Sequence, residues 1–582
     1  MNHRFIFTTI LLAQVTYSSE VIVTADKISK KINDSTNSVT IIDAESIANS
    51  PANTIEEILQ STPGIYISTN GSLGGISVLR MRGTGRGFSK VIIDGLELND
   101  PTDIDNSFQL NQLSLDNIAS IEILRGSQST VYGSDAIGGV IKITTKSGKL
   151  PTTKLRVGYG SYDSKSIDYS VIGTSQNGIN YSFSTSYFDT DGLSKYNGKL
   201  AETDRFNKLN IKGLVSKKFK SSKVSYQFHA TKSDTEIDDS TGDLADKDNA
   251  SYDQDIHQLS IENRLFNDLL LSKTSFKFME INRDSAGSYP SKTLGKEKAI
   301  SWQGSLFIGP TFTSVIGVEY NDQQADNQYD FSNTTRRSIR NTSFFISSNY
   351  IKDNYSADLA VRTDHNSVFD NYETWKIGGA YEVFSGLRIK TNLATGYKAP
   401  TIYQTYAGSQ NRDLKPTESF YYDFIISMEK SIFNIDLTYF NYDFKNQITY
   451  KTNRYENINK SEIKGLETEL KIKPTKDFIF GSAVTIQRAI NKETTKYLEK
   501  TPRLLVKSFL QIDSLISTNL EFTYVGRRND SGALPSYYLV NTSFHYENLK
   551  VSINNLLDRD YEDTRNYTTP GRNIFASYQF EL

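Results

Sequence analysis

The segment SIDYSVIGTSQNGINYSFSTSYFDT, Ser166–Thr190, alternates apolar and polar residues on both sides of an Asn-Gly pair. Alternation with a period of two around Asn177-Gly178 predicts a β-hairpin. One apolar face with aromatics near the strand ends, and one face of Ser, Asp and Thr, is typical of a lipid-facing strand around a wet lumen. A soluble β-sandwich also alternates, so the hairpin alone leaves that class open. The apolar faces would hold Ile167, Tyr169 and Val171 on the first strand and Ile179, Tyr181, Phe183 and Tyr187 on the second.

The same texture continues from Leu150 to the last residue, Leu582, where Asn573–Leu582 has the pattern of a closing strand. At about 20 residues per strand and connection, this length allows about 22 strands, far more than a sandwich takes. The composition agrees, with 35 Tyr and 31 Phe but only 12 Pro. The sequence therefore predicts a membrane all-β fold, a closed antiparallel transmembrane barrel over residues 150–582.

Composition excludes several other classes. The mean hydropathy of −0.46 argues against a helical membrane protein, whereas a barrel needs an apolar residue only at every second position. The net charge of −2 excludes a dominant nucleic-acid role, and the absence of Cys removes any disulfide or thiolate-metal framework. Residues 1–19 have the order of a signal peptide for Sec-type export, with Arg4, an apolar run and small residues.

Residues 27–149 mix helix and strand signals. Thr54-Ile-Glu-Glu57 has capping-box spacing, and Pro63-Gly64 would end the helix that it starts. Strand-like runs follow at Val91–Ile93 and Val140–Thr144. This part of the chain predicts a small α/β domain ahead of the barrel.

A series of short motifs runs through the chain in a fixed order. The amino-terminal motifs are EVIVTA (Glu20–Ala25), TIEEILQSTPGIYI (Thr54–Ile67), LRMRGTG (Leu79–Gly85), VIIDGLELND (Val91–Asp100) and IEILRGSQSTVYGSDAIGGVIKITTK (Ile121–Lys146). The later ones are GYKAP (Gly396–Pro400), NRDLKPTES (Asn411–Ser419), INKSEIKGLETEL (Ile458–Leu470), INNLLDRDYE (Ile553–Glu562) and TPGR (Thr569–Arg572). Together they resemble the TonB-dependent outer-membrane receptors from Glu20 to Leu582, and within that family they are most similar to the cobalamin receptors.

The resemblance implies a plug domain, residues 27–149, in the barrel lumen of a monomeric outer-membrane receptor surrounded by lipid. It implies active transport of cobalamin (vitamin B12) into the periplasm, driven by the inner-membrane proton gradient through TonB and the ExbB–ExbD complex. Residues 20–26 would form the TonB box. Extended and rich in β-branched residues, this segment could add as a strand to a partner's sheet edge. Its residues are Glu20, Val21, Ile22, Val23, Thr24 and Ala25.

The resemblance also implies site residues. Arg82 and Arg125 would pair with the barrel carboxylates Glu418 and Glu467 and hold the plug in register; ordinary surface charge is the alternative. Ligand contacts would come from the outward apices of the plug, although simple loop chemistry explains the same residues. These are Ile76, Ser77, Val78 and Gly85, with Asp103 and Ile104 in the stretch Asp100–Asn106.

Acidic residues gather on two connections that strand parity places at the outer face. Clustered carboxylates repel one another unless a hard cation lies between them, and oxygen ligands suit Ca²⁺. The alternative is that these carboxylates form an ordinary solvent-exposed acidic surface. The candidate ligands are Asp189, Asp191, Glu202, Asp204, Asp238 and Asp246.

Other functions were weighed on the same residues. Haem uptake is disfavoured because no His lies between Gly396 and Asn411, where haem receptors of this family carry one. A ferric siderophore receptor is the main alternative. A passive porin is the alternative from a different class, but a porin has no use for a domain that fills its lumen. The chain is not expected to be an enzyme, since it shows no catalytic residues: no nucleophile elbow, phosphate loop or metal triad.

Overall fold

The structure is a computed structural model. It describes residues 22–23, 27–71, 73–148, 150–196, 203–237, 248–286, 290–329, 332–333, 336–406, 411–451 and 453–582. No helix within these ranges is long and apolar enough to cross a membrane.

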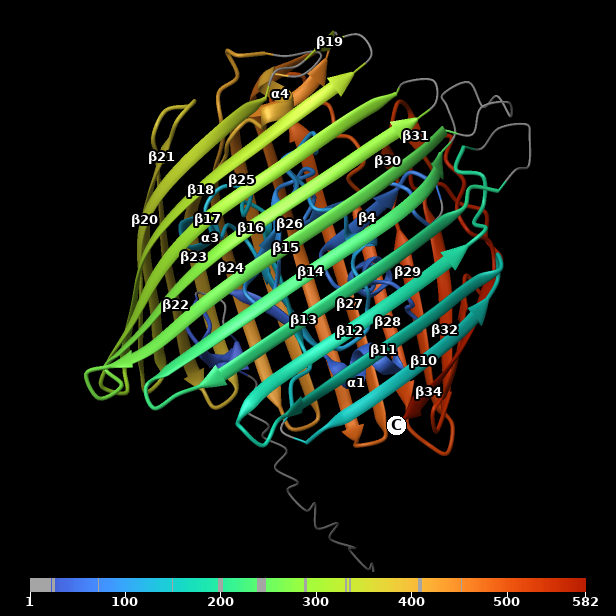
Figure 1. Ribbon diagram of the computed structural model, residues 1–582, viewed down its shortest axis with the longest axis horizontal. Helices are drawn as coiled ribbons and strands as arrows, with labels where there is room; N and C mark the ends of the chain where they lie inside the picture. The colour runs from blue at the N-terminus through green and yellow to red at the C-terminus, as the bar shows by residue number, and fades with distance from the viewer. Residues whose placement is uncertain are drawn as a thin grey trace, which may run out of the picture.

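A closed antiparallel barrel forms the wall of the molecule (Figure 1). Within the described residues, 22 strands make up this wall, and β19 (Ser332–Asn333) only extends the end of β18. The first half contains β10 (Thr152–Gly160), β11 (Ser164–Thr174), β12 (Ile179–Thr190), β13 (Phe206–Lys218), β14 (Ser222–Ile237), β15 (Asp248–Leu265), β16 (Leu270–Ala286), β17 (Ser291–Ile308), β18 (Phe312–Tyr329), β20 (Arg337–Lys352) and β21 (Tyr355–Asn366). The second half contains β22 (Tyr372–Phe384), β23 (Leu387–Lys398), β24 (Thr417–Lys430), β25 (Phe433–Lys451), β26 (Arg454–Thr475), β27 (Phe478–Asn491), β28 (Leu504–Ile512), β29 (Ser517–Val525), β32 (Tyr537–Tyr546), β33 (Leu549–Asn554) and β34 (Asn573–Glu581).

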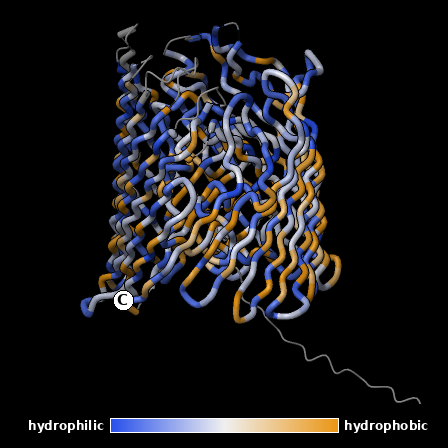
Figure 2. Tube along the Cα trace, turned by 90° about the vertical axis from the view of Figure 1, so that its right-hand side faces the viewer, coloured by the Kyte–Doolittle hydropathy of each residue, from blue (hydrophilic) through white to orange (hydrophobic). Residues whose placement is uncertain are grey.

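The barrel closes where β34 pairs with β10, with Phe580 opposite Leu155, so the prediction of a closing strand at the carboxyl terminus is confirmed. Side chains alternate as the hairpin at Ser166–Thr190 predicted. Ile167 is 53% exposed on the outer face, whereas Ser164 and Ser186 are buried on the lumen side. Figure 2 shows hydrophobic residues recurring along the strands of the wall. We call the end with the carboxyl terminus the lower end and the opposite end the rim.

The connections differ between the two ends. Lower-end turns are short, such as the one between β11 and β12, whereas rim connections are longer and carry α4 (Ile402–Tyr406), β30 (Arg528–Asn529) and β31 (Ala533–Leu534). The rim is therefore the end where the chain has room to build a binding surface.

The plug fills the lumen with a five-stranded sheet of order β3-β8-β9-β6-β7, in which only β6 and β9 run parallel. Its elements are β1 (Ile22–Val23), β2 (Lys30–Lys31), η1 (Ile32–Asp34), β3 (Ser38–Asp43), α1 (Ala44–Asn49), α2 (Ile55–Gln60), β4 (Ile65–Thr69), β5 (Ser77–Met81), β6 (Ser89–Ile93), β7 (Leu96–Leu98), η2 (Leu110–Gln112), β8 (Ile118–Arg125), α3 (Ser129–Tyr132) and β9 (Gly139–Thr145).

The predicted helix start at Thr54 is confirmed. The Thr54 hydroxyl accepts from the Glu57 N–H at 3.3 Å, and the Glu57 carboxylate accepts from the Asn53 N–H at 2.6 Å. The apolar face of α2, Ile55, Ile58 and Leu59, is fully buried against the plug sheet. This packing holds Glu56 and Glu57 on the opposite face of the helix, toward the barrel wall.

Candidate functional site

Two plug arginines converge on one barrel glutamate. Arg82 Nη2 lies 2.7 Å from Glu467 Oε1, and Arg125 Nε lies 3.7 Å from the same oxygen. All three side chains have at most 1% exposure. Burial alone would lower the pKa of Arg82, but the Glu467 carboxylate outweighs it, so the net pKa is raised and the guanidinium stays charged. Removing one partner would leave a buried charge uncompensated.

Glu418 does not join this cluster, which corrects the sequence prediction. In β24 the alternate residues Thr417, Ser419, Tyr421 and Asp423 face the lumen, so Glu418 lies on the outward face. Its place is taken by Glu469, two residues after Glu467 on β26, whose Oε1 lies 2.9 Å from Arg125 Nη1. A one-residue change in strand phase inverts the face of a side chain, and the motif alone does not set that phase.

Strand β3 completes the arginine cluster. Arg82 Nη2 donates to Ser38 Oγ at 3.0 Å, and Arg125 Nη2 donates to Thr40 Oγ1 at 2.9 Å. Arg82 Nη1 donates to the Tyr421 hydroxyl at 3.1 Å, and Tyr421 donates to Asp423 at 2.6 Å. Sequence reasoning missed these polar partners because single Ser, Thr and Tyr residues in strands carry no distinguishing signal.

The amino-terminal segment lies against the barrel wall. Ile22 pairs with Lys31 and Val23 with Lys30, so part of the predicted TonB box forms a short antiparallel ladder. Lys27 then forms an ion pair with Glu319 of β18 at 2.7 Å, and Lys30 pairs with Asp358 of β21 at 3.1 Å. Glu20, Val21, Thr24 and Ala25 lie outside the described residues.

The predicted ligand residues lie on plug loops near the rim connections, except Ser77 and Val78, which begin strand β5. Ile76 is 48% exposed, whereas Ser77 is buried with its hydroxyl 3.5 Å from a Glu56 oxygen. Val78 pairs with Ser68 inside the β4–β5 hairpin. Gly85 lies on the next loop, where the atoms nearest to an added Cβ belong to the Phe88 ring, at 3.6 Å. Among these residues, Ile76 offers the most surface to a ligand.

The third plug loop, which follows β7, contacts Arg86 of the loop that carries Gly85. The Arg86 guanidinium forms an ion pair with Asp103 and lies 3.7 Å from Asp105, while the Ile104 carbonyl accepts from the Thr401 hydroxyl at 2.7 Å. Burial raises the pKa of Asp105 to about 6, although Arg86 opposes this shift. Asp103 therefore serves as a counter-ion within the plug instead of presenting a free carboxylate to a ligand.

Two of the three candidate acidic rim residues that the structure describes are engaged within the protein. Asp189 forms an ion pair with Arg205 at 2.8 Å, and Asp204 accepts from the Lys195 N–H at 2.6 Å. Asp191 is exposed. Within the described ranges, no group of three or more carboxylate or imidazole side chains could hold a metal ion. Glu202, Asp238 and Asp246 lie outside those ranges.

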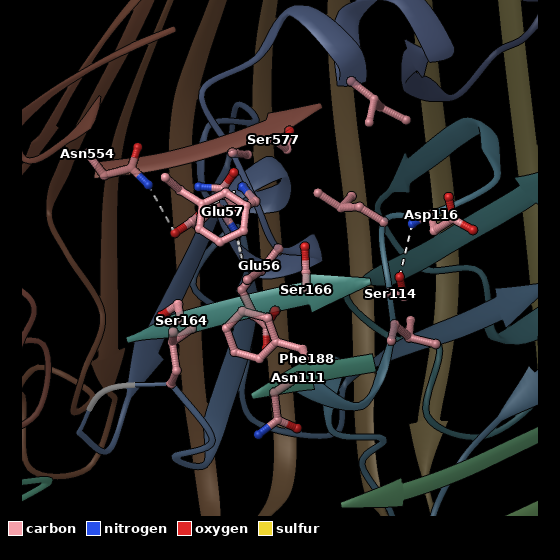
Figure 3. A pocket seen from close by; sticks show the side chains of 18 of the residues that line it. Glu56, Glu57, Asn111, Ser114, Asp116, Ser164, Ser166, Phe188, Asn554 and Ser577 are labelled. Carbon is pink, nitrogen blue, oxygen red and sulfur yellow. Dashed lines mark hydrogen bonds between the residues drawn. The ribbon is translucent and has the colours of Figure 1, made fainter. Parts of the chain in front are cut away.

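A cavity of about 520 Å³ separates the plug from the wall beside the barrel closure (Figure 3). Plug residues Glu56 and Glu57 of α2 line one side, and Ser166 and Ser577 belong to the opposite wall. Burial raises the pKa of both glutamates. Sequence reasoning did not predict this space, because it depends on how the plug sits in the lumen.

Comparison with known proteins decides the family. Residues 100–556 match the family model described as TonB dependent receptor-like, beta-barrel, and residues 31–140 match the TonB-dependent Receptor Plug Domain. This chain belongs to the TonB-dependent receptor family. Its members are outer-membrane transporters or receptors and not enzymes, so the barrel lies in the bacterial outer membrane.

Relatives differ in what their names say they carry. A "Vitamin B12 transporter BtuB" of Vibrio vulnificus is 23% identical over 98% of this chain and 96% of its own length, and one of Vibrio cholerae is 25% identical over 96% and 95%. Among solved structures, the ferric enterobactin receptor PfeA of Pseudomonas aeruginosa has a TM-score of 0.81 at 19% identity, covering 94% of this chain and 98% of that one. The siderophore receptor PirA of Acinetobacter baumannii has the same TM-score and coverage at 18% identity. At these identities the structural likeness shows the fold alone.

Outer-membrane barrels have short periplasmic turns and longer extracellular loops, so the lower end faces the periplasm and the rim faces outward. The rim carries an aromatic and cationic group that sequence reasoning missed, beyond noting abundant Tyr. Tyr406 of α4 has the guanidinium of Arg337 at 5.2 Å from its ring centre and that of Arg412 at 5.6 Å, and Tyr403 packs edge-on against Tyr455. Such a group can stack with flat or anionic ligand parts.

Proposed function

We propose that this TonB-dependent transporter imports cobalamin. The observation that carries the proposal is the surface that the plug presents toward the rim. Its exposed apex residue is apolar Ile76, and Arg86 of the next loop is neutralised by Asp103 and Asp105 of the loop after β7. Such a surface suits a large ligand whose periphery consists of amides instead of charges. The end-to-end relation to proteins named as vitamin B12 transporters points the same way.

A ferric siderophore is the second candidate, favoured by one specific observation. Arg337 and Arg412 flank Tyr406 at the rim, and both guanidinium groups are exposed. An anionic iron chelate would gain charge-assisted contacts there that a neutral ligand would not. The two candidates therefore depend on different residues, the plug apex and the rim arginines.

Equilibrium binding to the purified protein distinguishes them. Cyanocobalamin should bind the parent chain, and Ile76→Glu should weaken that binding about tenfold because a buried charge would then face the ligand. Arg337→Ala with Arg412→Ala should leave it within about twofold. Binding of a ferric chelate that is sensitive to the arginines and not to Ile76→Glu, without binding of cyanocobalamin, would overturn the proposal in favour of siderophore uptake.

Energy for release would come through TonB acting on Glu20–Ala25. Nanomolar binding corresponds to about 12 kcal/mol, and one charge crossing 100 mV supplies about 2.3 kcal/mol, so several protons would be needed for each ligand. Deleting Glu20–Ala25 should abolish uptake and leave surface binding intact. Val23→Pro should do the same because proline lacks the N–H that strand addition uses, whereas Val23→Ala should retain uptake. Normal uptake by the deletion variant would contradict the energised mechanism.

Calcium on the acidic rim connections is part of the same proposal. Because Asp189 already has Arg205 and Asp204 already accepts a backbone bond, we expect any site to depend on the other predicted ligands, Asp191, Glu202, Asp238 and Asp246. Removing calcium with a chelator should then weaken cyanocobalamin binding, and Asp238→Asn with Asp246→Asn should make binding insensitive to calcium. Equal binding by the parent chain with and without calcium would exclude the ion.

A further inference from the structure

The cavity beside the barrel closure extends along most of the height of the wall. Near the outer end its lining includes Ser161 and Tyr162 of the β10–β11 turn, and near the periplasmic end it includes Glu547 and Asn548 of the β32–β33 turn. The barrel strands around it are β10–β13, β29 and β32–β34. It therefore follows the route that a ligand must take between the two faces of the membrane.

The barrel side of this cavity is polar and rich in serine, with charged residues such as Arg156, Asp168 and Lys550 between the hydroxyl groups. Ser164, Ser166, Ser170, Ser186 and Ser577 line it, together with amide side chains such as Asn554. Small hydroxyl-bearing residues leave room and can form hydrogen bonds with a passing ligand without holding it by charge. In Figure 3, Glu57 and Ser114 face this wall from the plug.

Two polar atoms on the plug side have no partner. Asn111 Oδ1 and Asp116 Oδ2 both belong to lining residues, and neither makes a hydrogen bond within the described part of the chain. Buried acceptors are normally satisfied, so these two are free to receive N–H groups from a ligand or water. A ligand that carries several primary amides has such donors.

The plug is also held differently on its two sides. Ion pairs join it to the barrel at Arg82–Glu467, Lys30–Asp358, Arg283–Asp100 and Lys398–Asp135, on strands β16, β21, β23 and β26. Around the cavity the described plug–barrel contacts are hydrogen bonds, most of them to neutral groups, and Asn554 donates to Glu57 at 3.3 Å. Lys208 donates to the Leu113 carbonyl at 2.7 Å, and the Ser114 hydroxyl donates to Ser186 at 3.1 Å. Bonds to neutral acceptors break at lower cost than buried ion pairs, so this side should separate first.

We infer that the serine-lined cavity is a lumenal ligand site, through which the amide-bearing ligand passes along the β10–β12 and β34 wall. The inference rests on the proposed function for the class of ligand. A space of about 520 Å³ lies within the usual range of ligand pockets and holds part of a large ligand, so local withdrawal of the 111–117 segment would complete the passage.

The chain contains no Cys, so single thiols can be placed in the cavity without background. Ser166→Cys and Ser577→Cys are near-isosteric and should fold normally. In cells taking up cyanocobalamin, each is treated with a reversible disulfide-forming reagent that carries biotin, and the adduct is verified by mass. The matched control is Ser301→Cys on β17, which lines a second cavity of about 400 Å³ on the opposite wall, where ion pairs such as Lys27–Glu319 join the plug to the barrel.

Adducts at positions 166 and 577 should reduce uptake about tenfold, with recovery after reduction, and leave surface binding unchanged. The adduct at position 301 should leave uptake within about twofold. Equal loss at all three positions, no loss at 166 and 577, or no adduct formation there during uptake would each overturn the inference. If the unmodified chain takes up no cobalamin, the proposed substrate fails instead, and the same adducts are then scored with a ferric chelate that it does take up.

Discussion

Replacing Glu467 by Gln should loosen the plug more than any other single change in the arginine cluster. Gln keeps the shape of the side chain but removes the charge that faces Arg82 at 2.7 Å and Arg125 at 3.7 Å. Because both guanidinium groups are fully buried, they would be left without their shared counter-ion. Loss of one partner of such a buried pair costs about 3–5 kcal/mol. With an m-value of about 2 kcal/mol/M for a domain of this size, the urea midpoint of plug unfolding should fall by about 2 M.

Pulse proteolysis of the purified protein across a urea series measures that midpoint, with loss of the plug fragment read by mass. Glu469→Gln is a graded control, because its side chain is 25% exposed and should cost only about 1 kcal/mol. Glu418→Gln, on the outward face, should leave the midpoint unchanged. A Glu467→Gln midpoint equal to that of the parent chain, or a larger effect from Glu418→Gln, would refute the assignment of the cluster.

Three further predictions concern the plug. Lys27→Ala should weaken the attachment of the amino-terminal segment by about 1 kcal/mol, seen as faster cleavage by protease, and Lys27→Arg should keep protection because it retains the charge that faces Glu319. The pKa of Asp105 is about 6 in the folded plug, against 3.8 ordinarily, so protonation of this group favours the folded state at low pH. This contribution to stability is lost as the pH rises from about 4 to 6. Asp105→Asn should therefore make the urea midpoint less dependent on pH across this window. Gly126→Ala should lower the free energy of unfolding by about 1–3 kcal/mol, because Gly126 has a φ of +91° and an added Cβ would lie 2.5 Å from the Tyr421 ring. Gly379→Ala is the control, and it should leave the urea midpoint unchanged because an added Cβ would have no atom within 4 Å.

The barrel was predictable because its signal is local and repeated. Each strand must place apolar residues toward lipid at every second position, so a hairpin such as Ser166–Thr190 already determines which side chains face outward. The plug helix at Ile55–Gln60 was also predictable, since its capping residues and buried face lie within a few positions of one another. Family motifs added the order of the domains.

Contacts between plug and barrel were predicted less well, because they depend on strand phase and on the position of one domain inside another. Glu467 and Glu418 both lie in family motifs, yet only Glu467 has the phase that faces the lumen. Asp103 lies on the expected apex, but Arg86, seventeen positions earlier, occupies its carboxylate. The cavity wall combines strands from both ends of the barrel sequence, β10–β12 and β34, which become neighbours only when the barrel closes.

The position of β3 connects the amino-terminal segment to the arginine cluster. β3 is the edge strand of the plug sheet and pairs only with β8 among the strands of the described plug, so a pull on the preceding residues would peel it away before any inner strand. Its side chains Ser38 and Thr40 accept hydrogen bonds from Arg82 and Arg125. Separation of β3 would therefore remove two of the hydrogen-bond acceptors of the buried guanidinium groups and weaken their interaction with Glu467. Force on the segment would thus reach the strongest plug contacts through two residues of one strand, before the inner strands of the plug sheet separate.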